Sequence, residues 1–130
     1  MIKFKESEIR DKAYLETEIE SEAQRIFKSS KANKGRSIET IREKVRQGKT
    51  AEVWMIENWG FKAAKDVYHD LIDSEGNLIE VKAYNPYNCN TEYIQNVVEK
   101  LKSSVWNQSK WLFLFEYDNG TYTFLKKIAI

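Results

Sequence analysis

Three residues in the second half of the chain could do chemistry together: Asp70, Glu80 and Lys82. Successive side chains of a strand point to opposite faces, so Glu80 and Lys82 would share one face. If the chain forms a hairpin that is symmetric about Glu75, Asp70 lies directly opposite Glu80. Opposed carboxylates whose Cβ atoms lie about 5 Å apart repel each other and need a cation. A hard divalent ion such as Mg²⁺ is suitable, because it binds carboxylate, water and phosphate oxygens, and Lys82 could orient a phosphate or a water.

The residues around this trio predict the hairpin that would position it. Residues 66–72 and 78–84 are rich in strand-forming side chains, and a stretch of turn-forming residues separates them. Pairing about Glu75 places His69 on the face away from Asp70. A structural role for the only imidazole of the chain is therefore favoured over a role as general base.

Apolar spacing and breaker residues predict the other elements. Residues 94–105 carry apolar side chains at helical spacing, and 111–117 form the nearly continuous apolar run of a buried central strand. A turn at 118–120 should lead into a last strand at 121–125. Upstream of the hairpin, the sequence predicts helices over 7–27, 37–48 and 50–60. A polar loop at 29–36 follows the first helix, and Ser37 is the expected N-cap of the second. Gly48 should form the break between the second and third helices, and Gly60 should cap the end of the third.

The segments Asp70-Leu71-Ile72 and Glu80-Val81-Lys82, with nine residues between Asp70 and Glu80, resemble the signature of the PD-(D/E)XK nuclease superfamily. The helix expected from Thr50, which contains Glu52, resembles the first core helix of that family, which often supplies a further acidic residue. The order helix, strands, helix, strand is similar to the restriction-endonuclease-like fold over roughly residues 37–126. The resemblance implies an α/β (α+β) fold with a central mixed sheet flanked by helices, to which an N-terminal helical segment is added.

The same resemblance implies a metal-dependent endonuclease that hydrolyses phosphodiester bonds in DNA. Asp70 and Glu80 would hold Mg²⁺, for which Mn²⁺ could substitute, and Glu52 would assist directly or through water. The ion would polarise the scissile phosphate and lower the pKa of an attacking water that Lys82 helps to position. One site per chain implies that cleavage of both strands of a duplex requires a homodimer.

Charge is distributed unevenly along the chain. Residues 1–24 hold four basic and seven acidic side chains, whereas residues 25–49 hold nine basic and two acidic ones. A block of this kind beside the predicted catalytic helix suits contact with a phosphate backbone, although a solvated basic loop is the ordinary alternative. The residues expected to bind nucleic acid are Lys34, Arg36, Arg42, Arg46 and Lys49.

Length and composition limit the remaining possibilities. The 130 residues fit one domain, expected to consist of an N-terminal helix and basic loop at 1–36 and a catalytic core at 37–130. One Cys and one His exclude a disulfide within the chain and a zinc site built on Cys or on paired His. The opening residues lack an apolar signal, and no apolar run approaches the ~20 residues that span a bilayer, so we expect a soluble cytoplasmic protein. Core-facing spacing predicts burial of Trp54, Trp59, Trp106 and Trp111.

Other functions stay open on these residues. An RNA-cleaving or toxin-type nuclease, or a junction or repair nuclease, would use the same fold on another substrate. A nucleic-acid-binding module that does not cut would keep the basic block, but it would not need Asp70 and Glu80. The simplest alternative is a solvated sheet face on which Lys82 pairs with the two carboxylates, a contact of about 0–1 kcal/mol.

Overall fold

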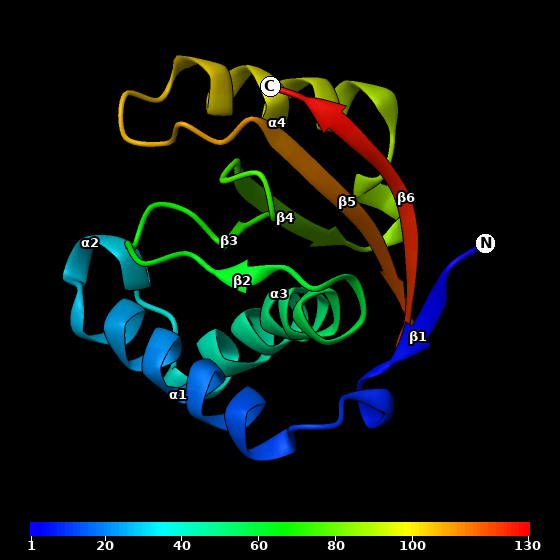
Figure 1. The fold of residues 1–130 in the computed structure, drawn as a ribbon. Coiled ribbons are helices and arrows are strands. Elements are labelled where there is room, and N and C mark those ends of the chain that lie inside the picture. Colours follow the sequence, from blue (N-terminus) through cyan, green and yellow to red (C-terminus); the bar gives the residue numbers. More distant parts are fainter.

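The computed structural model describes residues 1–130 as an α+β fold, in which helices flank both faces of a curled, mixed, six-stranded sheet (Figure 1). The elements are β1 (Lys3–Lys5), η1 (Glu6–Glu8), α1 (Lys12–Lys28), α2 (Ser30–Asn33), α3 (Ile38–Trp59), β2 (Lys62–Ala63), β3 (Leu71–Ile72), β4 (Leu78–Tyr84), η2 (Pro86–Asn88), α4 (Thr91–Ser103), β5 (Trp111–Asp118) and β6 (Thr121–Ala129). The strand order is β1-β6-β5-β4-β3-β2, with β4 and β5 parallel and all other neighbours antiparallel. The expected mixed sheet flanked by helices is therefore confirmed. None of the helices is both long and apolar enough to cross a bilayer.

The hairpin that leads into β4 has the predicted register. Leu71 pairs with Ile79 and Ile72 with Leu78, as symmetry about Glu75 requires. The predicted strand over 66–72 is wrong in length, because only its last two residues are in β3.

The turn before β3 explains the missing strand residues. The Asp66 side chain accepts hydrogen bonds from the backbone N–H groups of Tyr68 and His69 at 2.8 and 3.0 Å. These local bonds bend the backbone and compete with strand pairing. Asp70 therefore lies just before β3, at the point where the chain enters the sheet.

Helix α3 is continuous where the sequence predicted two helices. Ser37 caps its first turn by accepting a hydrogen bond from the Thr40 N–H, and Gly60 ends it in the left-handed conformation, both as predicted. The predicted break at Gly48 is wrong. A single glycine costs a helix about 1 kcal/mol and leaves the backbone hydrogen bonds in place, and buried residues on both sides of it hold the helix on the core.

Replacing Gly48 by alanine should stabilise the protein. A Cβ at this position would meet no atom closer than Oε2 of Glu52, at 4.0 Å, which is an ordinary contact. We expect the free energy of unfolding, measured with urea, to rise by about 1 kcal/mol. Gly60→Ala is the matched control and should destabilise, because its φ is +72°. A Gly48→Ala variant that unfolds more easily would contradict this account of the helix.

The N-terminal segment shares the core of the rest of the chain. Phe4 of β1 stacks on Trp54 of α3 and on Tyr122 of β6, with ring centroids 4.4 and 4.9 Å apart. Leu15 and Ile19 of α1 belong to the same buried cluster. Residues 1–36 are thus part of one domain with α3 and the sheet.

The opposite face of the sheet is covered less completely. Ile94 of α4 is buried, but α4 ends at Ser103, so the helix predicted over 94–105 is two residues too long, and Val105 is 77% exposed. The predicted burial of tryptophan is right for Trp54 and wrong for Trp106, which is 66% exposed.

Candidate active site

The structure brings three of the predicted site residues close enough for their charges to act on the fourth, Asp70. Glu52 comes from α3, Asp70 from the chain just before β3, and Glu80 and Lys82 from β4. Burial and then the charges of Glu52 and Glu80 raise the pKa of Asp70, whereas the hydrogen bond from the Val81 N–H and the charge of Lys82 lower it. Alternation along β4 directs Glu80 and Lys82 away from the core face occupied by Val81, so the group gathers around the end of β3.

Asp70 and Glu52 each hold one hydrogen-bonded oxygen and one free oxygen. Oδ2 of Asp70 accepts from the Val81 N–H at 2.8 Å, which fixes the carboxylate against β4. Oε1 of Glu52 lies 3.3 Å from Nζ of Lys49, one helical turn earlier. Oδ1 of Asp70 and Oε2 of Glu52 accept no hydrogen bond from the protein.

Glu80 is held on both of its oxygens. Oε2 accepts a 2.7 Å hydrogen bond from Nδ2 of Asn107, and Oε1 lies 3.5 Å from Nζ of Lys82. No sequence pattern indicated Asn107, because its two partners lie 27 and 39 residues away in the chain. A cross-strand carboxylate pair was predicted between Asp70 and Glu80, but the free oxygens belong to Asp70 and Glu52.

Burial and mutual repulsion make this acidic group unfavourable when fully ionised. Burial raises the pKa of Glu52 to about 7, with Lys49 opposing this shift and the charge of Glu80 adding to it. Burial, followed by the charges of Glu52 and Glu80, raises the pKa of Asp70 well above its usual value. Strongly shifted carboxyl groups in a pocket are a common property of functional sites.

The two lysines remain cations. Burial lowers the pKa of Lys82, but the charge of Glu80 and the smaller effects of Tyr84 and Asp70 more than offset it, so the pKa lies above its usual value. The pKa of Lys49 is raised in the same way, chiefly by Glu52. When all three carboxyl groups are ionised they outnumber the two ammonium groups, and the raised pKa values of Glu52 and Asp70 show that the folded protein disfavours this state.

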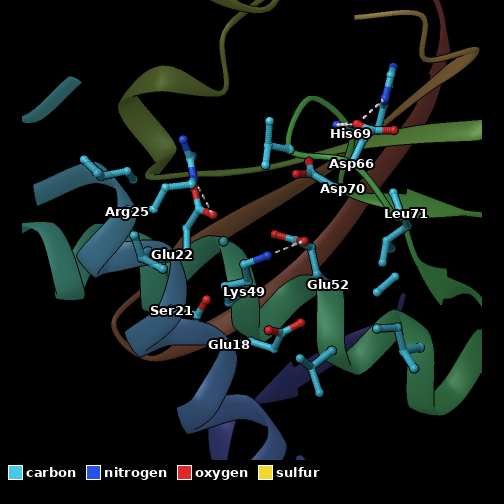
Figure 2. A pocket seen from close by; sticks show the side chains of 18 of the residues that line it. Glu18, Ser21, Glu22, Arg25, Lys49, Glu52, Asp66, His69, Asp70 and Leu71 are labelled. Atoms are coloured by element: carbon cyan, nitrogen blue, oxygen red, sulfur yellow. Dashed lines mark hydrogen bonds and ion pairs between the residues drawn. The ribbon is translucent and has the colours of Figure 1, made fainter. Parts of the chain in front are cut away.

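A pocket of about 360 Å³ opens beside Asp70 and Glu52, between α1, α3 and residues 63–71. Figure 2 shows both carboxylates facing this space, with Lys49 beside Glu52. Glu80 and Lys82 do not line the pocket. The other charged and polar side chains around it include Glu18, Glu22, Arg25, Lys44 and Lys49.

The donors at this site suit a hard divalent cation. No three His, Cys, Asp or Glu side chains meet in a geometry that would hold a metal ion. The free oxygens of Asp70 and Glu52 nevertheless face one pocket, and Mg²⁺ typically takes one or two carboxylates with the rest of its shell supplied by water and phosphate. The residues present therefore fit an ion of this type by donor chemistry.

Most of the predicted nucleic-acid-binding residues have partners within the protein. Arg42 pairs with both oxygens of Glu20 at 2.8 and 2.9 Å, and Arg46 pairs with Glu16 at 2.6 and 2.9 Å. These ion pairs join α3 to the acidic face of α1 and neutralise much of the basic block. Arg46 also pairs with Glu6, and Lys49 pairs with Glu52. Arg36 donates hydrogen bonds to backbone carbonyls of α2. Lys34 is exposed and has no partner.

Both ring nitrogens of His69 are occupied. Nδ1 lies 2.8 Å from Oδ1 of Asp66, and Nε2 accepts a 2.8 Å hydrogen bond from the Gln108 N–H. The proton of the ring is therefore on Nδ1, and the side chain is only 7% exposed. The imidazole ties the turn before β3 to the loop after α4, which agrees with the structural role predicted for it.

Replacing His69 by alanine should cost stability. The loss of two hydrogen bonds predicts a decrease of about 1–3 kcal/mol in the free energy of unfolding. For the nuclease activity that the sequence predicts, the pH dependence of a cleavage step, followed in single turnovers, should stay the same. A several-hundred-fold fall in rate with the fold preserved would instead make His69 a catalytic base.

The chain was compared with models of protein families, with curated proteins and with solved structures. None of the three comparisons found a match.

Proposed function

We propose that this protein is a metal-dependent endonuclease of the PD-(D/E)XK type that hydrolyses phosphodiester bonds in DNA. The main support is that the charges of Glu52, Glu80 and Lys82, which the spacing and the family resemblance indicated, all act on Asp70, and that Asp70 and Glu52 line an open pocket. The order α3, β2, β3, β4, α4, β5 agrees with the proposed restriction-endonuclease-like core over residues 37–130.

Each member of the group has a role set by its contacts. Asp70 and Glu52 would hold Mg²⁺ or Mn²⁺ through their free oxygens, and Glu80, which Asn107 and Lys82 hold in place, is the third proposed ligand. A bound ion of this kind supplies Lewis-acid polarisation of the phosphate and a lower pKa for the attacking water. Lys82 lies beside Glu80, is partly exposed and stays protonated, so it offers a positive charge to the phosphate or to the attacking water.

The buried carboxyl groups argue against a module that binds nucleic acid without cutting it. Burial and neighbouring charge raise the pKa values of Glu52 and Asp70, so ionising both groups in the folded protein is costly unless a cation is bound. A binding surface would gain nothing from burying Glu52 at this point. A catalytic metal site explains why such a costly arrangement is present.

Cleavage of defined substrates tests the proposal. Purified protein should cleave duplex, single-stranded or branched DNA in Mg²⁺ and should do nothing in EDTA. RNA in the same panel separates the RNA-cleaving alternative, and sedimentation of the active species tests the proposed homodimer. Failure to cut any DNA in Mg²⁺ or Mn²⁺, or cutting that persists in EDTA, would contradict the proposed function.

A further inference from the structure

An exposed aromatic ridge stands beside the candidate site. The rings of Tyr68 and Trp106 are stacked, with centroids 5.5 Å apart and planes 19° from parallel. Tyr68 is 50% exposed and Trp106 is 66% exposed, and their neighbours Val67 and Val105 are exposed as well. A grouped set of large apolar side chains on the surface of a protein is typical of a binding surface.

The ridge is held in place by hydrogen bonds. Oγ of Ser104 accepts from the N–H groups of Trp106 and Asn107 at 3.3 and 3.2 Å. Nδ2 of Asn107 donates to the Tyr68 carbonyl at 3.0 Å, and the Gln108 N–H donates to His69. The two loops that carry the aromatic rings are thus joined, and the stack exists before any ligand binds.

The same asparagine connects the ridge to the carboxylates. Nδ2 of Asn107 also donates to Oε2 of Glu80 at 2.7 Å. In Figure 1 the loop after α4 and the loop between β2 and β3 lie on the same side of the molecule, beyond the end of the short strand β3. A chain that crosses the candidate site therefore passes close to the stacked rings.

The charge of the segment that carries Trp106 suits a polyanion. Residues 100–110, which include Trp106, contain three lysines and no acidic residue. Unlike Arg42 and Arg46, these lysines form no ion pair within the protein. A flat aromatic surface flanked by free positive charge is the combination that binds single-stranded nucleic acid.

We propose that Tyr68 and Trp106 stack an unpaired base of single-stranded DNA whose backbone passes the carboxylate site. This inference rests on the proposed nuclease function and names the form of its substrate. Stacking on an outward-facing ring needs a base whose own face is open, whereas the bases inside a duplex are covered by their neighbours. A strand with unpaired bases is thus the expected substrate, in place of continuous duplex.

Binding without metal tests the ridge independently of cleavage. The probe is a fluorescein-labelled oligodeoxythymidylate of about 12 nucleotides, free or annealed to its complement, and its anisotropy is measured in EDTA. The free strand should bind more tightly than the duplex, and Trp106→Ala should weaken its binding by about fivefold to a hundredfold. Trp106→Phe should retain most of the affinity. Tyr87→Ala removes a ring that is 88% exposed and outside the ridge, so it should change nothing.

The outcomes separate the two proposals. Loss of single-strand binding in Trp106→Ala, with the circular dichroism spectrum unchanged, supports stacking whether or not the protein cleaves DNA. Absence of cleavage in Mg²⁺ would overturn only the nuclease function. Unchanged affinity in Trp106→Ala, or equal weakening for strand and duplex, would overturn stacking. A second copy of the chain is the competing occupant, and a Trp106→Ala variant that changes from dimer to monomer without losing DNA affinity would show that the ridge is a dimer contact.

Discussion

Replacing Asp70 by asparagine should abolish Mg²⁺-dependent cleavage while making the metal-free protein more stable. Asparagine keeps an oxygen that can accept the hydrogen bond from the Val81 N–H, but it removes a carboxyl group whose ionised form is disfavoured by burial and by the charges of Glu52 and Glu80. Loss of a ligand that stabilises transition-state charge by several kcal/mol corresponds to a fall in rate of more than about a thousandfold. Relief of the repulsion should raise the free energy of unfolding in EDTA near neutral pH.

Single-turnover cleavage and urea denaturation in EDTA measure the two effects on the same protein. Glu80→Gln should behave in the same direction, since glutamine can still accept from Asn107. Asp118→Asn is the matched control, because Asp118 is exposed at the end of β5 and should affect neither quantity. Cleavage that persists in Asp70→Asn would remove the site hypothesis, and a loss of stability would show that its charge is compensated within the protein.

The metal-free protein should become less stable as the pH rises from about 5 to about 8. The pKa of Glu52 is raised from 4.5 to about 7 by burial, so the folded state binds this proton more tightly than the unfolded state does. The stability gained from that proton is complete below the unfolded value and is lost as the pH rises through about 7. The loss is on the order of 3 kcal/mol for Glu52, and Asp70 acts in the same direction.

Other shifted groups do not change stability in this pH range. The pKa values of Glu16 and Asp66 are lowered, so their contribution is lost only at more acid pH, and the raised values of Lys49 and Lys82 act above the range. Denaturation with urea at several pH values, with EDTA or with Mg²⁺, measures the effect.

Mg²⁺ should restore most of the stability at the alkaline end, and Glu52→Gln should flatten the pH dependence. Stability that increases toward pH 8 in EDTA would contradict the electrostatic description of the site.

The sequence alone predicted the caps of α3 and the register of the β3–β4 hairpin, where the deciding interactions are local. The Ser37 side chain caps the start of α3 by accepting a hydrogen bond three residues away, and Gly60 ends the helix because glycine adopts the left-handed conformation easily. The register of β3 and β4 follows from a turn in which Asp73 accepts hydrogen bonds from the N–H groups of Glu75 and Asn77. These bonds join neighbours in the chain, so residue type and spacing were sufficient.

Tertiary structure alone decided which charges and rings are free. The sequence predicted that Arg42 and Arg46 belong to a basic surface. Their acidic partners lie 22 and 30 residues away in the chain, and the ion pairs form only when α1 packs on α3. The exposure of Trp106 depends on which segments pack against the loop after α4, and the spacing of residues in the sequence does not predict that packing.

The same distinction applies to the site. Spacing selected Asp70, Glu80 and Lys82 by chemical type, whereas the free oxygens of Asp70 and Glu52 and the hold of Asn107 on Glu80 follow from contacts between distant segments. Burial and Coulomb interactions act through space, so their effect on a residue is set by the folded arrangement and not by its neighbours in the sequence.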